Sequence, residues 1–152
     1  MKHLLAIALL SLTLVGCNQQ EDNRIQSQGT NIDFTKVTNK DAPVSQSIAT
    51  QAKKTILENE EVTAVRGINT SEKVLLAFKV KQFDSFRETK LEDELKNKLE
   101  KAFPEKKIFV SSDEKIFIEL DQLEKEIQNK DMNEDELKKD FKTIQDLLND
   151  EA

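Results

Sequence analysis

Cys17 is the residue whose position in the sequence points most directly to a defined chemistry, and it is the only cysteine in the chain. Lys2 supplies a positive charge near the start, and a run of apolar and small residues then extends from Leu4 to Val15. This arrangement is typical of a secretory signal peptide. The run has 12 residues, whereas a membrane-spanning helix needs about 20. We therefore expect a cleaved signal peptide over residues 1–16.

The four residues Leu14-Val15-Gly16-Cys17 resemble the lipobox of bacterial lipoproteins. In those proteins the cysteine thiol takes a diacylglyceryl group, and cleavage before the cysteine makes it the new N-terminus. Two or more acyl chains on one residue give stable membrane anchoring, where a single chain holds only marginally. Cys17 is therefore the predicted lipid-attachment site, with the membrane as its partner. The alternative, an ordinary signal peptide cut nearby, would leave a free thiol in a secreted protein.

The rest of the mature chain offers few residues for catalysis. His3 is the only histidine and is removed with the signal peptide, so Ser/His/Asp and Cys/His arrangements and a zinc site with His or Cys ligands are excluded. Carboxylates are abundant, but acid–base catalysis also needs a cleft where burial raises one pKa. We expect no enzyme activity, no catalytic residues, no metal and no cofactor. A deep polar pocket lined by buried carboxylates would instead favour a ligand-binding or enzymatic lipoprotein.

Four oxygen-bearing side chains alternate in a way that faintly resembles a calcium loop: Asn129, Asp131, Asn133 and Asp135. The EF-hand pattern requires Gly at the sixth position and Glu at the twelfth. Counting from the first of these residues, those positions hold Glu134 and Asp140. We therefore expect a solvated connection between two helices rather than a metal site.

Two further features have a structural and a functional interpretation. Gly67 lies inside a predicted strand, where a bulge or a strand-end bend is favoured over close approach by a ligand. Phe83 and Phe86 flank Asp84 in a predicted loop. We expect both rings to pack under the following helix, with a partner-binding knob as the alternative.

The charge balance limits the partners of the protein. The chain has 152 residues, with 29 acidic and 23 basic side chains and a net charge of −6. An acidic balance argues against nucleic acid, because phosphate binding requires a basic face. It also disfavours attraction to anionic lipid, which leaves the acyl chains to hold the membrane.

The mature chain divides into a tether and one domain. Residues 17–43 contain the lipidated cysteine and a stretch rich in Asn and Gln, with Ile32 and Phe34 scattered among them. Such a stretch buries too little apolar surface to offset its ordering entropy, so we expect it to be disordered. Residues 44–152 are long enough for a single domain that ends in an amphipathic helix.

Hydrophobic periodicity predicts the elements of the domain. The first helix is expected from Ser45, its N-cap, to about Asn59. The second helix is expected to end at Ala102. It can begin at Ser85 or at Thr89, because both fit a capping box, Ser85 with Glu88 and Thr89 with Glu92. Strands are expected over 62–68, 73–80 and 108–110, the first two forming a hairpin. Residues 111–128 are ambiguous: Ile116, Ile118 and Leu120 alternate as in a strand, whereas a helix capped by Ser112 or Asp113 matches more positions and is preferred over 114–128. The last helix begins at Asn133, boxed with Glu136.

This order, α-β-β-α-β-α-α, predicts an α+β fold. We expect a two-layer sandwich in which helices cover one face of a small three-stranded sheet, because Val74, Leu76, Phe78 and Val80 alternate onto one side. The topology of residues 45–111 resembles BON domains and the ring-building domains of secretion systems. That likeness favours, as a second hypothesis, a self-associating envelope scaffold, which would be a homo-oligomer.

Four features of the sequence occur together: the lipobox, the polar tether, the hairpin formed by Val62–Val65 and Val74–Ala77, and the run from Phe103-Pro104 to Ile108–Asp113. This combination resembles the YhcN/YlaJ-like sporulation lipoproteins of spore-forming Gram-positive bacteria. The resemblance implies a lipid-anchored accessory protein of spore formation or germination, with an unknown protein partner and no established catalytic activity. It places the protein on the extracytoplasmic face of the cell or spore membrane, and it supports a helix after Asp113.

Overall fold

The structure is a computed structural model that describes residues 26–27, 30–31, 33–81, 85–130 and 132–150. Cys17 and the predicted signal peptide lie outside these residues, so both stay predictions. No helix among the described residues is long and apolar enough to cross a bilayer.

The described elements follow the predicted order, with three short strands added at the N-terminal end. The helices are α1 (Ser47–Leu57), α2 (Ser85–Ala102), α3 (Glu114–Asn129) and α4 (Glu134–Asp150). The long strands are β4 (Val62–Asn69), β5 (Lys73–Val80) and β6 (Lys107–Ser111). The short strands are β1 (Gln26–Ser27), β2 (Thr30–Asn31) and β3 (Asp33–Phe34).

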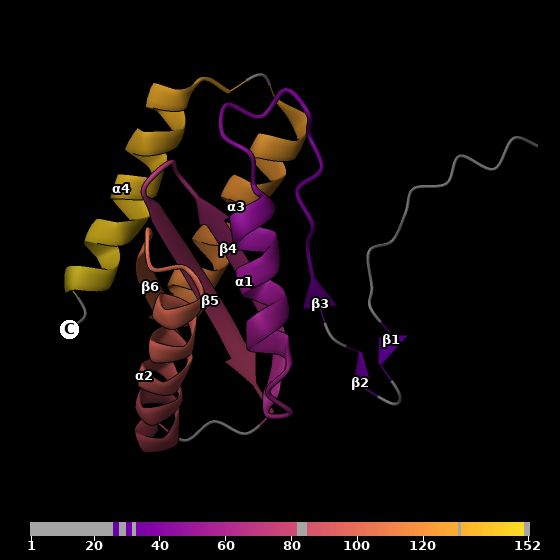
Figure 1. Ribbon diagram of the computed structural model, residues 1–152, viewed down its shortest axis with the longest axis vertical. Helices are drawn as coiled ribbons and strands as arrows, with labels where there is room; N and C mark the ends of the chain where they lie inside the picture. Colours follow the sequence, from indigo (N-terminus) through magenta and orange to yellow (C-terminus); the bar gives the residue numbers. More distant parts are fainter. Residues whose placement is uncertain (1–25, 28–29, 32, 82–84, 131, 151–152) are drawn as a thin grey trace, which may run out of the picture.

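One mixed sheet with the order β3-β4-β5-β6 forms the centre of the domain (Figure 1). β4 and β5 form the predicted antiparallel hairpin, in which Ile68 lies opposite Leu75. β6 is parallel to β5, and β3 is parallel to β4. β1 and β2 pair only with each other.

The predicted α+β fold, in which helices pack against a small sheet, is confirmed. The helices lie on both faces of the sheet rather than on the one face that was expected. One core lies between the sheet and α1 and α2, and it contains Leu76, Phe78 and Ile108. The other core lies between the sheet and α3 and α4, and it contains Leu75 and Ala77. Figure 1 shows α1 and α2 in front of the sheet and α3 behind it. A continuous apolar run such as that in β5 is typical of a strand buried on both faces.

The helical prediction for residues 114–128 is confirmed. Asp113 is the N-cap of α3, and its carboxylate accepts a hydrogen bond from the Ile116 backbone N–H at 2.9 Å. The capping box of α4 is also confirmed, because Asn133 and Glu136 accept hydrogen bonds from each other's backbone N–H groups. α2 begins at Ser85 rather than Thr89.

The start of α1 differs from the prediction. Gln46, not Ser45, occupies the N-cap position, and its side chain makes no capping hydrogen bond. The acceptor comes from β4 instead, since Asn69 Oδ1 accepts a hydrogen bond from the Ala49 backbone N–H at 3.0 Å. The Gln46 side-chain amide in turn pairs with both backbone groups of Asn69 at 2.9 Å. These bonds fix the start of α1 against the edge of β4.

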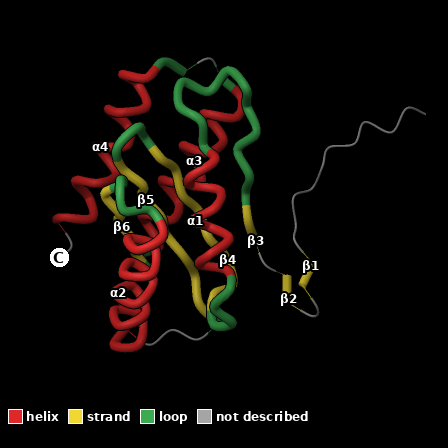
Figure 2. The backbone as a smooth tube through the Cα atoms, in the orientation of Figure 1, coloured by secondary structure: helices red, strands yellow, loops and turns green. Residues whose placement is uncertain are grey.

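The fold begins before the expected boundary at residue 44. Phe34 pairs with β4, and Val37 is only 8% exposed in the core that α3 and α4 form. The Asn39 side chain donates a hydrogen bond to the Ile127 carbonyl at 2.8 Å. Figure 2 shows the segment after β3 running beside the domain to the start of α1. Residues 33–43, which the sequence analysis assigned to the tether, therefore pack against the domain.

Candidate functional site

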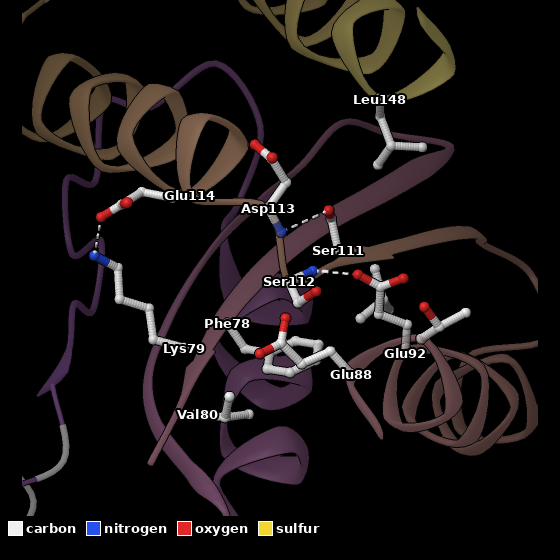
Figure 3. Close-up of a pocket in the computed structure, with 12 residues that line it drawn as sticks. Phe78, Lys79, Val80, Glu88, Glu92, Ser111, Ser112, Asp113, Glu114 and Leu148 are labelled. Atoms are coloured by element: carbon white, nitrogen blue, oxygen red, sulfur yellow. Dashed lines mark hydrogen bonds and ion pairs between the residues drawn. The ribbon is translucent and has the colours of Figure 1, made fainter. Parts of the chain in front are cut away.

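A cavity of about 730 Å³ lies where β5 and β6 end (Figure 3). Its walls come from the end of β5 (Phe78–Val80), the first half of α2, the segment Val110–Glu114 and Leu148 of α4. Small-molecule sites in proteins usually enclose about 300–1,000 Å³ and combine apolar walls with a few polar groups. The cavity has both properties.

The segment after β6 forms a rigid wall of this cavity. Ser111 Oγ accepts a hydrogen bond from the Asp113 backbone N–H at 3.1 Å, and Asp113 caps α3. Glu92 of α2 accepts a hydrogen bond from the Ser112 backbone N–H. Short-range Ser and Asp bonds of this kind favour turns over regular structure. They end β6 and direct the chain into α3.

α2 presents two carboxylates to the cavity. Leu91, Leu95 and Leu99 are buried in the core that α1 and α2 form, which fixes the rotation of the helix. Glu88 and Glu92 lie four residues apart and therefore on the same side of α2, and both line the cavity. The buried leucines of α2 thus fix the position of its two cavity-lining carboxylates.

The cavity is acidic, with the carboxylates of Glu88, Glu92, Asp113 and Glu114 against the single ammonium of Lys79. Three of the carboxylates have a donor: Glu92 and Asp113 accept backbone N–H groups, and Glu114 binds Lys79 at 3.0 Å. Glu88 differs, because its side chain is buried at 7% exposure and Oε1 has no hydrogen-bond partner among the described residues.

A second cluster of charges lies at the edge of β4, beyond the end of β3. Lys53 of α1 and Glu124 of α3 are 1% and 0% exposed, with Nζ and Oε1 2.5 Å apart. Lys53 also donates to the Thr35 carbonyl, and Glu124 accepts the Gly67 backbone N–H at 2.8 Å. Burial lowers the pKa of Lys53 and raises the pKa of Glu124, and the attraction between the two charges opposes both shifts. The cluster is enclosed, so it joins α1, β4 and α3 rather than facing a ligand.

Arg66 extends this cluster toward the surface. Its guanidinium binds Asp121 (Nε to Oδ1, 2.5 Å) and Asp33 (Nη2 to Oδ2, 2.8 Å) and lies 5.0 Å above the centre of the Phe117 ring. Burial alone would lower the pKa of Arg66, but the hydrogen bonds with Asp33 and Asp121 outweigh it and raise that pKa. Asp121 also binds Lys125 at 2.5 Å. This network connects β3, β4 and α3.

Gly67 and Phe86 are in different surroundings from those that the sequence predicts. Gly67 lies within regular pairing opposite Leu76, so the predicted bulge or bend at this position is wrong; the irregularity in β4 lies between Val62 and Ala64. A Cβ atom at Gly67 would come 2.6 Å from Leu76 Cδ2, which explains the glycine. Phe86 is 83% exposed, contrary to the expected packing under α2.

The other singled-out residues are only partly described. Asn133 caps α4, and Asp131 and Phe83 lie outside the described residues. No group of three or more His, Cys, Asp or Glu side chains in the described part of the chain could hold a metal ion.

The family model for the sporulation lipoprotein YhcN/YlaJ matches residues 16–146. The chain belongs to this family. A search of curated proteins and a search of solved structures gave no match. The matched region begins one residue before Cys17 and ends within α4. It therefore includes the predicted anchor residue and most of the domain.

Membership of the sporulation lipoprotein YhcN/YlaJ family implies a membrane anchor. The family is a lipoprotein family and not a known enzyme family. Its name associates this protein with sporulation.

Two features of this sporulation lipoprotein could not be found from its sequence. The sequence around Glu88 fits a capping box. The burial of Glu88 results from β5 and the segment after β6, which are distant in the sequence. Lys53 and Glu124 are 71 residues apart, and each is followed by a lysine in its helix, Lys54 and Lys125. One signal was available for Lys53. It lies beside Ala52 and three residues before Ile56, on the apolar side of α1, and a fully buried lysine is expected to have a charged partner.

Proposed function

We propose that this protein is a membrane-anchored accessory or interaction component that acts in spore formation or germination. The observation that carries the proposal is the family match over residues 16–146, which includes Gly16 and Cys17 of the predicted lipobox and most of the domain. In this account Cys17 carries the acyl chains on the extracytoplasmic face of the cell or spore membrane. The domain then meets its protein partner close to that membrane.

The N-terminal part of the fold fits such an arrangement. Because residues 33–43 pack against the domain, 15 residues separate Cys17 from Asp33 at the start of β3. Even a fully extended chain of that length spans no more than about 50–55 Å. The domain would therefore stay near the headgroups.

The anchor is tested by replacing Cys17 with Ala in the full chain. We expect Cys17→Ala to move the protein from the membrane fraction to the soluble fraction and to abolish labelling by a fatty-acid probe, because no other cysteine is present. Gln20→Ala, which keeps the thiol, is the matched control and should stay membrane-bound and labelled. Membrane retention of Cys17→Ala would argue against the lipid anchor.

The association with the spore is tested separately by following the protein through growth and sporulation. We expect it to appear in sporulating cells and to be carried into the spore. Equal amounts in growing cells that do not sporulate would contradict this part of the proposal while leaving the anchor intact.

A self-associating scaffold is the second candidate, and the sheet edge favours it. β6 ends the order β3-β4-β5-β6, and a strand at an edge can pair with a strand of another chain. The opposite edge is formed by the two-residue strand β3, and beyond it Gln46 and Glu124 occupy backbone groups of Asn69 and Gly67 in β4. A discrete oligomer of the detergent-solubilised full chain, seen by crosslinking and size-exclusion chromatography, would favour the scaffold, and a monomer would exclude it.

A further inference from the structure

The cavity at the ends of β5 and β6 contains a buried acceptor that the described fold does not use. Oε1 of Glu88 has no hydrogen-bond partner among the described residues, and the side chain is 7% exposed. Figure 3 shows the Glu88 carboxylate extending from α2 over Phe78 into the space that Ser112 and Val80 border. Buried polar groups in folded proteins are nearly always paired, so an unpaired carboxylate in a cavity needs an explanation. A bound donor would supply one.

The charges around Glu88 favour a cationic donor. Glu92, Asp113 and Glu114 line the same cavity, and the only basic side chain there, Lys79, is already bound to Glu114. A metal ion fits poorly, since no cluster of three or more candidate ligand side chains exists in the described part of the chain. An ammonium group fits better, because it carries positive charge and three N–H donors.

The remaining walls favour an aliphatic body attached to that ammonium group. Phe78, Val80, Val110 and Leu148 contribute apolar surface to the cavity. A chain of methylene groups can cover such surface while its charged end binds the carboxylate, as lysine side chains do within proteins.

We propose that this cavity binds a small aliphatic amine, with its ammonium group on Glu88 and its methylene chain against Val80, Val110 and Leu148. The site is separate from the lipid anchor and adds a ligand to the proposed function. Glu88 is the specificity-determining residue, because it supplies the buried charge.

The proposal is tested by calorimetric titration of the full chain, purified in neutral detergent, with 1,5-diaminopentane. We expect saturable binding of the diamine and none of 1,5-pentanediol, which has the same chain length without the charge. Glu88→Gln should weaken diamine binding at least tenfold. Glu100→Gln removes the same charge from an exposed position of α2 and should leave binding unchanged.

Two further measurements separate this site from its alternatives. Glu88→Gln should unfold at the same or a higher urea concentration than the parent, because the lost carboxylate oxygen has no described partner; a large loss of stability would mean a purely structural role and overturn the proposal. Equal diamine binding by Glu88→Gln and Glu100→Gln would show diffuse attraction to the net charge of −6. Binding of Ca²⁺ but not of the diamine would overturn the choice of ligand.

Discussion

At the scale of single residues, the pair formed by Lys53 and Glu124 places two charged groups out of contact with water. Both side chains are almost fully buried, and Glu124 Oε2 has no hydrogen-bond partner among the described residues, with Arg66 Nε 3.8 Å away. Removing two charges from water costs several kcal/mol each, and the attraction between them repays this only when both are present. The pair therefore specifies how α1 and α3 meet more than it adds net stability.

Lys53→Met should destabilise the protein by about 3–5 kcal/mol, because Glu124 is left as an unpaired buried charge. In Lys53→Met/Glu124→Gln the amide oxygen can still accept the Gly67 N–H, so the double variant should recover most of this loss. The free energy of unfolding from urea titrations measures both effects. If the double variant were as unstable as the single one, the loss would come from packing rather than from the unpaired charge.

The burial of Glu124 also predicts a pH dependence for Lys53→Met. Burial raises the pKa of Glu124, and losing the Lys53 charge should raise it further, so the folded variant holds this proton at pH values where the unfolded chain has released it. The stability of Lys53→Met should therefore fall as the pH rises from the ordinary Glu range through the raised pKa. A deficit relative to the parent that was the same at pH 5 and pH 8 would contradict this.

Asp121 should contribute to stability with the opposite pH dependence. Burial alone would raise the pKa of Asp121, but hydrogen bonds from Lys125 and Arg66 outweigh it and leave that pKa lowered. The contribution of Asp121 to the free energy of unfolding is therefore complete above the ordinary Asp pKa, and it is lost as the pH falls through the lowered pKa of Asp121. Asp121→Asn should cost about 1–2 kcal/mol at pH 7, and its difference from the parent should shrink in acid. Asp93→Asn, on the exposed side of α2, should show neither effect.

At the scale of elements, α1 is held by a strand rather than by its own cap. Asn69 at the end of β4 accepts the Ala49 N–H, donates to the Ser45 carbonyl at 3.1 Å, and shares its backbone groups with the Gln46 amide. The helix, the hairpin and the edge of the sheet thus depend on one asparagine. No pattern within residues 45–59 encodes this.

Asn69→Ala should therefore cost more than the loss of an ordinary helix cap. We expect about 2–3 kcal/mol, because the buried Ala49 N–H loses its acceptor and the Asn69 side-chain amide no longer donates to the Ser45 and Thr70 carbonyls. Asn133→Ala removes the exposed capping box of α4 and should cost about 1 kcal/mol. Urea unfolding of the two variants compares them directly, and an equal loss for both would contradict the structural role assigned to Asn69.

The elements that the sequence predicted well are those set by local pattern. The alternation and turn of β4 and β5 predicted the hairpin, and Asp113 before the Ile116, Leu120, Leu123 and Ile127 stripe predicted α3. The errors involve partners far away in the chain. Val37 is buried because α3 and α4 form a second core on that face of the sheet. The same core buries Leu75 and Ala77 of β5. Glu88 and Glu124 are ordinary helix residues until the strands and helices around them are assembled.

At the scale of the whole molecule, the protein is a compact α/β/α domain on a short connection to a predicted lipid anchor. The domain supplies one acidic cavity and one open sheet edge, and the family match associates it with a membrane and with sporulation. The anchor determines where either surface can act. The account therefore depends most on the chemical state of Cys17.

Mass spectrometry of the N-terminal peptide from the mature protein measures that state directly. The account predicts a first residue of Cys17, with a diacylglyceryl group on its sulfur. A mature terminus at another residue, or a Cys17 thiol that iodoacetamide can still alkylate, would contradict the account.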